Sequence, residues 1–428
     1  MTQTFELLES NVRSYCRSFP DMFVRAKGSI LHAESGRTYI DFFAGAGALN
    51  YGHNNDYIKR ALIEYLESDG VSHGLDLYTS AKEKFLQTFS DKILKPRNLE
   101  YKVQFCGPTG TNAVEAAFKL ARKAKGRTGI FSFMGAFHGM SLGSLAATSS
   151  LYHREAGGVP LHDITFMPFP AGFMEGFDTI GYMEQVLTDD HSGIAKPAAI
   201  ILETIQAEGG LNIAPVEWLH QLRDLCDRHD ILLIADDIQV GCGRTGPFFS
   251  FERAGIVPDL VVLSKSISGY GLPMSLVLMK PELDVWKPAE HNGTFRGNQL
   301  AFVGATAAIE FRELTRMEEE TKLKAKYVEE FLRNEILPLS KDITIRGEGL
   351  LWGVDVSASA DEQLSQAIAS RCYELGLIIE RAGRRSSVVK LLPALTITMD
   401  ELAAGCAILK QAVAECVEKT EAPQPVLV

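Results

Sequence analysis

The middle of the chain alternates short apolar runs with amphipathic stretches. The short runs are apolar at successive positions, as in strands buried between two layers of helices. They are the segments 101–105, 128–133, 198–203, 231–235, 259–263 and 275–279. Between the first two, apolar residues of segment 112–125 recur at helical spacing. The pattern predicts a doubly covered, mostly parallel α/β sheet.

The patterns on either side of this region are more mixed. Residues 37–42 predict a strand and 55–68 a helix, while a long helix near 316–335 leads to short strands and two helices over 343–416. The last residues, 418–428, have the composition of a loose tail.

These patterns suggest two lobes. We expect residues 56–325 to form a large cofactor-binding α/β domain. Residues 1–55 would complete a smaller α+β lobe made mainly by residues 326–428. A cleft between two lobes is a favoured place for a small-molecule site.

Composition excludes several classes of protein. The formal net charge of -11 argues against a nucleic-acid partner, and no run has the roughly 20 apolar residues that span a membrane. The seven cysteines are widely spaced, which favours a soluble protein of the reducing cytoplasm. Cys226 and His229 are too few for a zinc site, so we expect no metal centre of this kind.

A glycine-containing turn follows the first predicted strand. It runs from Gly107 to Asn112 and opens a helix, and Asn112 with Glu115 resembles a capping box. Free backbone N–H groups at such a helix start bind anions. The alternative is an ordinary capped turn.

Two further polar groups follow buried strands. Asp236 stands at the end of 231–235, where a carboxylate needs a cationic partner; the adjacent Asp237 is the candidate for a simple helix cap. Lys265 follows 259–263 beside small residues, where burial would lower its pKa and free the amine for Schiff-base chemistry. A lysine considered alone is more often a surface group. The turn, Asp236 and Lys265 together, however, match what pyridoxal 5′-phosphate (PLP) requires. The cofactor needs a phosphate site, a carboxylate at the ring nitrogen and a lysine.

Over nearly its whole length the sequence resembles the class III (ω-amino-acid) aminotransferases. The resemblance implies the PLP fold-type I architecture and a dimer, or a tetramer built from dimers, with shared active sites. It implies catalytic roles for Lys265 and Asp236. The cofactor-binding positions that match the family motifs are Gly110, Thr111, Phe137, His138, Asp236, Gln239, Lys265 and Thr294, the last contributed to the partner subunit's cofactor.

The family also suggests residues for the substrate. Glu208, in the segment 203–210, matches a glutamate thought to cover a fixed cation, and Lys390 stands where 4-aminobutyrate and ornithine aminotransferases carry an arginine. A second arginine of those relatives corresponds to Met140. Because lysine does not replace a bidentate arginine, both departures argue against those two substrates. Arg17 is a candidate for the other carboxylate, or simply a surface arginine.

Residues 12–20 and 73–79 are similar to the ectoine-pathway branch of the family. That similarity implies transfer of an amino group from L-glutamate to L-aspartate-4-semialdehyde, giving L-2,4-diaminobutyrate and 2-oxoglutarate. Relatives in this branch often need K+, for which the sequence shows no binding motif. The alternatives are another ω-aminotransferase of the 4-aminobutyrate or ornithine type, a PLP racemase or aminomutase, and a catalytically inactive PLP-fold binding protein.

Overall fold

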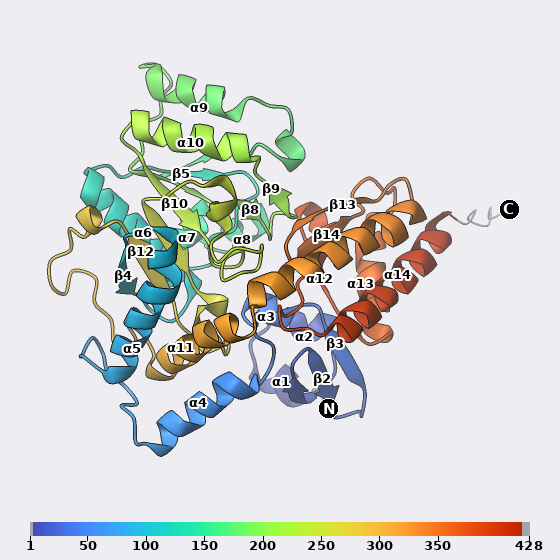
Figure 1. The fold of residues 1–428 in the computed structure, drawn as a ribbon. Coiled ribbons are helices and arrows are strands. Elements are labelled where there is room, and N and C mark those ends of the chain that lie inside the picture. The colour runs from blue at the N-terminus through green and yellow to red at the C-terminus, as the bar shows by residue number, and fades with distance from the viewer. Residues whose placement is uncertain (1–2, 422–428) are drawn as a thin grey trace.

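A seven-stranded sheet forms the centre of the larger part of the molecule (Figure 1). The structure, a computed structural model, describes residues 3–421. The strands, in their order across the sheet, are β4 (Lys102–Phe105), β12 (Leu276–Met279), β11 (Leu260–Leu263), β10 (Leu232–Asp236), β7 (Ala199–Leu202), β5 (Ile130–Phe133) and β6 (Ile164–Met167). Only β12 in this sheet runs antiparallel to its neighbours.

All six predicted strands are present, and the predicted mostly parallel α/β sheet is confirmed. The sequence pattern missed β6. This strand lies at the edge of the sheet, and three of its four residues are only partly buried. Partial burial alone does not explain the miss, because β4 at the opposite edge is also only partly buried and is among the predicted strands.

Helices cover both faces of this sheet. Alternate residues of β10 show the two layers: Leu232 and Ile234 pack in the cluster that contains α6 (Gly110–Lys125), whereas Leu233 and Ala235 pack in the cluster that contains α10 (Val216–Arg228). Because successive side chains of a strand point to opposite faces, each strand must be apolar throughout. The other helices of this part are α4 (Asp56–Glu67), α5 (Ser80–Phe89), α7 (Leu142–Ala147), α8 (Leu151–Glu155), α9 (Thr179–Thr188) and α11 (Gln299–Leu314).

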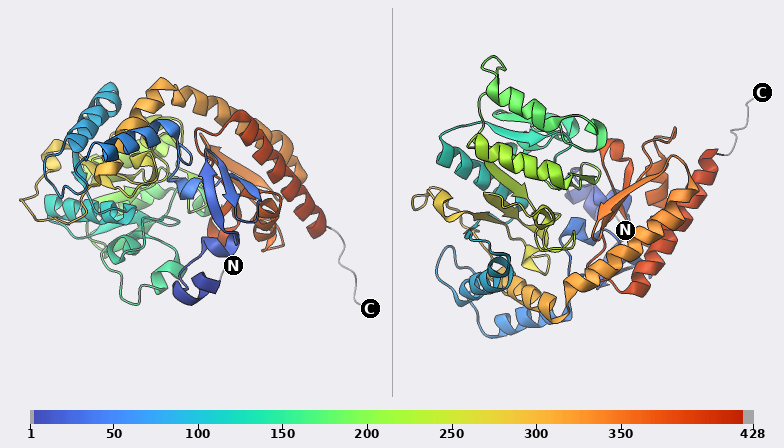
Figure 2. Two further views of the ribbon diagram at one scale, coloured as in Figure 1. Left: turned by 90° about the horizontal axis from the view of Figure 1, so that it is seen from below. Right: turned by 45° about the horizontal axis from the view of Figure 1, so that its top comes forward.

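The two ends of the chain meet in the smaller part of the molecule (Figure 2). Strand β3 (Thr38–Asp41) pairs in parallel with β15 (Leu377–Ile378), so a strand from the C-terminal region joins the N-terminal sheet. That sheet also contains β1 (Phe23–Lys27) and β2 (Ile30–Ala33). Short helices α1 (Gln3–Leu8), α2 (Tyr15–Ser18) and α3 (Ala44–Gly47) flank these strands in the sequence.

A second four-stranded sheet belongs to the C-terminal region. Its order is β13 (Thr344–Glu348), β14 (Leu351–Asp355), β17 (Val388–Leu391) and β16 (Glu380–Ala382), accompanied by α12 (Met317–Phe331), α13 (Leu364–Glu374) and α14 (Met399–Glu421). Helix α14 continues through residue 421, so the first residues of the predicted tail, 418–421, are helical and that part of the prediction is wrong. Just before them, Cys416 and Val417 are buried in the core. Residues 422–428 lie outside the described residues.

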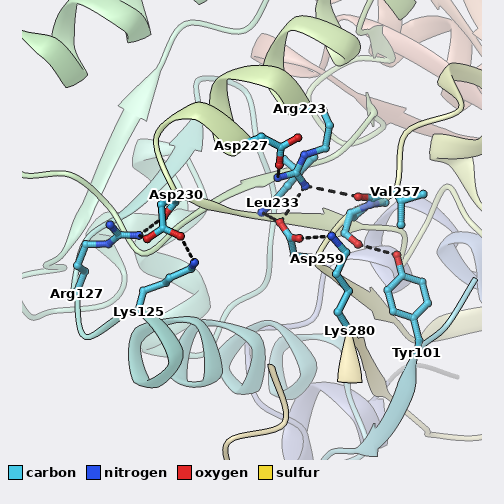
Figure 3. Close-up of polar contacts among 11 residues, drawn as sticks. Tyr101, Lys125, Arg127, Arg223, Asp227, Asp230, Leu233, Val257, Asp259 and Lys280 are labelled. Carbon is cyan, nitrogen blue, oxygen red and sulfur yellow. Dashed lines mark hydrogen bonds and ion pairs between the residues drawn. The ribbon is translucent and has the colours of Figure 1, made fainter. Parts of the chain in front are cut away.

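A buried carboxylate fixes the amino end of β11 (Figure 3). Asp259 accepts hydrogen bonds from the Leu233 backbone N–H at 2.8 Å, Arg223 Nη1 at 2.9 Å and Lys280 Nζ at 2.6 Å. Burial raises the pKa of Asp259, but Arg223 and Lys280 more than offset this, so the pKa lies below its usual value. The network joins α10, β10, β11 and the end of β12 on the side of the sheet away from Lys265. Over the described residues, no helix combines the length and apolar character that crossing a membrane would take.

Candidate active site

A cavity of about 170 Å³ opens where the parallel strands of the main sheet end. In an open α/β sheet, the carboxyl ends of the strands are where ligands bind. Eight sequence-predicted site residues line it: Gly110, Thr111, Phe137, His138, Glu208, Asp236, Gln239 and Lys265. A wider cleft of about 1220 Å³ adjoins this cavity, since Phe137, Glu208 and Lys265 line both.

The start of α6 forms one wall of the cavity. Thr109 is its N-cap, and the Thr109 backbone N–H donates to Asn112 Oδ1 at 3.2 Å. The predicted box of Asn112 and Glu115 is therefore wrong: Glu115 instead accepts the Gly143 N–H at 3.0 Å. The helix begins at Gly110, where a Cβ atom would stand 2.9 Å from Ile238 Cδ1. A larger residue at this position would require the Ile238 side chain to shift.

Asp236 is held by a histidine from a neighbouring loop. The Asp236 carboxylate ends β10, and its Oδ2 lies 2.7 Å from His138 Nδ1, with both side chains buried. Its Oδ1 accepts the Ile238 backbone N–H at 3.1 Å. Asp237 accepts hydrogen bonds from the backbone N–H and the hydroxyl of Ser250. Ser250 begins the short 3-10 helix Ser250–Ala254, so Asp237 caps a helix that is distant in the sequence and not one that follows it directly.

Lys265 stands just past β11 in a left-handed backbone conformation, with φ of 49°. Such a conformation is costly for a residue with a side chain and persists where the surroundings fix it. The flanking serines do so: Ser264 Oγ donates to Met274 O at 2.9 Å, and Ser266 Oγ donates to Gly47 O at 2.7 Å. Burial lowers the pKa of the Lys265 ammonium, an effect that Glu208 opposes. A lowered pKa makes the amine easier to deprotonate.

A chain of polar contacts runs behind the cavity. Gln239 Nε2 donates to Glu208 Oε1 at 3.0 Å, and Lys390 Nζ lies 2.7 Å from the same oxygen. Lys390 is fully buried in β17 and also lies 2.9 Å from Glu380 Oε1. Although burial raises the pKa of Glu208, Lys390 and Lys265 lower it to about 2. Lys390 therefore pairs with Glu208 from behind and does not line the cavity.

Two predicted site residues lie elsewhere. Arg17 is exposed and donates from Nη2 to the Asn11 carbonyl at 3.1 Å, and it lines neither the cavity nor the wider cleft. Thr294 is exposed in the loop before α11 and does not line the cavity of its own chain. That placement leaves Thr294 available to a second subunit.

The residues present fit PLP. Among the described residues, the buried atoms His138 Nε2 and Gln239 Oε1 have no hydrogen-bond partner, and both residues line the cavity. A buried polar atom without a hydrogen bond costs about 1–3 kcal/mol of free energy, so two such atoms in one cavity indicate a ligand that binds them. The start of α6 offers backbone N–H groups for a phosphate, and Asp236 and Lys265 converge on the same small volume.

Comparisons with known proteins agree with this site. The model of the family described as aminotransferase class-III matches residues 15–413. A diaminobutyrate–2-oxoglutarate transaminase of Streptomyces coelicolor is 57% identical over 96% of this chain and 97% of its own. A diaminobutyrate–2-oxoglutarate transaminase of Halalkalibacterium halodurans is 50% identical over 98% of this chain and 99% of its own.

Solved structures share the fold. An ornithine aminotransferase from Toxoplasma gondii, crystallized with partial occupancy of PLP at its active site, superposes with a TM-score of 0.86 at 23% identity, covering 98% of this chain and 95% of that one. A transaminase from the marine bacterium Virgibacillus superposes with a TM-score of 0.88 at 20% identity, and the match covers 98% of this chain and 99% of that one. These likenesses confirm the expected fold.

The chain belongs to the class III aminotransferases. It is a PLP-dependent transaminase, as the members of this family are. The relatives from Streptomyces coelicolor and Halalkalibacterium halodurans act, by their names, on diaminobutyrate and 2-oxoglutarate.

Sequence reasoning missed two buried carboxylates at the site. Glu203 lines the cavity and accepts the Phe137 N–H at 3.0 Å; burial and Asp236 raise its pKa well above the usual value. Glu380 lines the wider cleft beside Glu208. A glutamate directly after the apolar run 375–379 was the available signal for it. Among the described residues, the one trio with metal-like spacing, 189–191, is exposed and lines neither space.

Proposed function

We propose that this enzyme transfers an amino group from L-glutamate to L-aspartate-4-semialdehyde, giving L-2,4-diaminobutyrate and 2-oxoglutarate, as a step of ectoine biosynthesis. The observation that carries the proposal is the identity of 50–57% over nearly the full length to relatives named for diaminobutyrate and 2-oxoglutarate. Met140, at the position where 4-aminobutyrate and ornithine aminotransferases have an arginine, lines the wider cleft and supports the same choice.

The proposed roles follow from the placement of each group. PLP, when bound, supplies an aldehyde for the amino group and a ring that withdraws electrons from the reacting carbon. Lys265 Nζ is the general base and acid that takes and returns the proton of that carbon, help typically worth about 10²–10⁴ in rate. Asp236 holds a proton at the ring nitrogen, and His138 fixes the orientation of the Asp236 carboxylate.

The remaining site residues bind and orient. The backbone at Gly110 and Thr111 would hold the phosphate, Phe137 would pack against the ring, and Gln239 would bind the ring oxygen. Glu208 covers Lys390, and Arg17 stays the sequence-based candidate for a substrate carboxylate. Its exposure means that the N-terminal segment would have to change conformation for Arg17 to reach the cleft.

We also propose a homodimer, or a tetramer built from dimers, with shared sites. A group of apolar side chains is exposed on the segments next to Thr294: Leu75, Leu77, Tyr78 and Phe295. The His73 and Phe295 rings lie 5.3 Å apart, which joins the two segments into one apolar surface. Exposed contiguous apolar surface marks protein interfaces. A second copy covering it would bring Thr294 to the partner's cofactor.

A cytoplasmic location is part of the proposal. Of the seven cysteines, all among the described residues, six are buried in the core and one, Cys16, is exposed. Buried cysteines of this kind behave as small apolar side chains.

A panel assay tests the proposed reaction. Purified holoenzyme, glutamate and one of several semialdehydes would be incubated, and 2-oxoglutarate and the new amine would be measured, in potassium and in sodium salts. We expect aspartate-4-semialdehyde to give the highest kcat/KM. Preference for succinate semialdehyde or glutamate-5-semialdehyde would overturn the assignment, and absence of 2-oxoglutarate with racemised product would indicate an isomerase.

A further inference from the structure

Three charged side chains meet beside the wider cleft, and two of them, Glu208 and Glu380, line it. Glu380 in β16 and Lys390 in β17 are direct cross-strand partners, and Lys390 Nζ lies 2.9 Å from Glu380 Oε1 and 2.7 Å from Glu208 Oε1. Lys390 is fully buried and Glu380 is 7% exposed. Two carboxylates therefore share one ammonium group, and the cluster carries a net negative charge when all three are ionised.

Glu380 and Glu208 hold Lys390 in different ways. The cross-strand pairing of β16 with β17 fixes Glu380 against Lys390. Glu208 follows β8 (Ile205–Gln206), comes from a different part of the chain, and has a partly exposed side chain. Buried opposite charges attract strongly because little water screens them. Burial raises the pKa of Glu380 to about 7, although Lys390 opposes this, so Glu380 is partly ionised near neutral pH. Ionised Glu380 pairs with Lys390 whatever conformation Glu208 takes, and the fully ionised cluster is net negative.

This excess charge faces the reacting centre. Glu380, Glu208 and Lys265 line the same wider cleft. Glu380 Oε1 is buried and, apart from its ion pair with Lys390, has no hydrogen-bond partner among the described residues. Tyr15 lines the cleft as well, and burial, Glu380 and Glu208 raise the pKa of its hydroxyl to about 12. Arg381, Arg384 and Arg385 line the cleft too, so the negative charge is local to Glu208 and Glu380. A cationic ligand group is favoured beside these two carboxylates.

We propose that Glu380 is a specificity-determining residue, which makes the Glu208–Lys390–Glu380 cluster net negative so that it binds the second, non-reacting ammonium group of a diamino acid. The inference rests on the proposed function and names how that substrate is distinguished. A mono-amino ω-acid has no second ammonium group to offer. Its carboxylate also finds Lys390 already neutralised. In this scheme Lys390 orders the two glutamates and does not itself bind a substrate carboxylate.

The first test uses the wild-type holoenzyme and three amino donors, with 2-oxoglutarate as acceptor. L-2,4-diaminobutyrate carries the second ammonium group, 4-amino-2-hydroxybutyrate replaces it with a hydroxyl, and 4-aminobutyrate lacks it. A hydrogen bond to a charged group is worth about 1.5–3 kcal/mol, so we expect kcat/KM to favour diaminobutyrate over the hydroxy analogue by about tenfold or more. A ratio near one overturns the inference, and this arm does not depend on any variant folding.

The second test removes the charge of Glu380. In Glu380→Gln the preference for diaminobutyrate over the hydroxy analogue should fall about tenfold. The kcat/KM for 4-aminobutyrate should rise, because Lys390 keeps only Glu208 as its counter-charge. The exposed Glu282 gives a matched control, Glu282→Gln, in which both ratios should stay at wild-type values. The visible absorbance of the bound cofactor and the thermal midpoint verify folding.

The outcomes separate the two proposals. If the wild-type enzyme converts diaminobutyrate and Glu380→Gln keeps its selectivity, the role of Glu380 is refuted while the proposed function stands. If the wild-type enzyme transaminates other amines but not diaminobutyrate, the proposed function fails and the inference fails with it.

Discussion

His138 Nδ1 lies 2.7 Å from Asp236 Oδ2, and both side chains are buried. These residues are almost a hundred positions apart in the sequence. His138 lies in the loop after β5, and Asp236 is the last residue of β10. Their contact means that the carboxylate predicted to face the cofactor nitrogen has its orientation fixed before any ligand binds. Preorganised groups of this kind stabilise developing charge without reorganising during the reaction.

Asp236→Asn should therefore lose turnover by about 100-fold or more while still binding PLP, because the amide does not hold a proton at the ring nitrogen as a carboxylate does. The measurements are kcat by 2-oxoglutarate release and cofactor content by absorbance. Asp224→Asn, an exposed position on α10, is the matched control. Near-normal turnover in Asp236→Asn would remove Asp236 from the mechanism.

Lys265→Ala should abolish transamination and the visible absorbance of the lysine-bound cofactor. Removing the amine removes both the covalent attachment and the proton-transfer group. The protein should still fold, because Ser264 and Ser266 keep their anchoring hydrogen bonds. Lys326→Ala, on the exposed side of α12, serves as control. Wild-type turnover in Lys265→Ala would refute the assigned role.

Thr294→Ala tests the shared site. If Thr294 donates to the phosphate bound by the partner subunit, its loss should raise the dissociation constant of PLP about tenfold in the intact oligomer, at an unchanged oligomeric mass. Thr344→Ala, exposed in β13, should bind PLP normally. Equal affinity in both variants would place Thr294 outside the cofactor site.

Asp237→Asn should alter how stability depends on pH. Burial raises the pKa of Asp237 to about 7 from its ordinary 3.8, although hydrogen bonds from Ser250 oppose this. The folded state therefore holds the proton more tightly than the unfolded state. The stability that Asp237 contributes is complete below about pH 4 and is lost as the pH rises through about 7, with each pKa unit worth about 1.4 kcal/mol.

Thermal midpoints measured between about pH 5 and about pH 8 check this expectation. The asparagine variant should gain stability relative to the wild type as the pH rises. Parallel curves for the two proteins would show that Asp237 does not titrate in this range. Asp224→Asn should follow the wild-type curve, because this side chain is exposed.

Much of the fold could be predicted from the local pattern of apolar and polar residues. The central strands were predicted because both of their faces are buried. Edge position does not explain why β6 was missed, because β4, at the other edge and no more buried, was predicted. The capping box was placed wrongly because Thr109 and Asn112 satisfy the same spacing rule as Asn112 and Glu115. Local spacing alone does not say which residue begins the helix.

The sequence by itself determined which residues follow buried strands, and hence that Asp236, Lys265 and the start of α6 converge at one edge of the sheet. Only the tertiary structure decided which groups touch: His138 with Asp236, and Glu380 with Lys390 across β16 and β17. The reason is physical. Burial of a strand depends on its own residues, whereas a contact between side chains depends on strand order and register, which are set by packing between segments far apart in the chain.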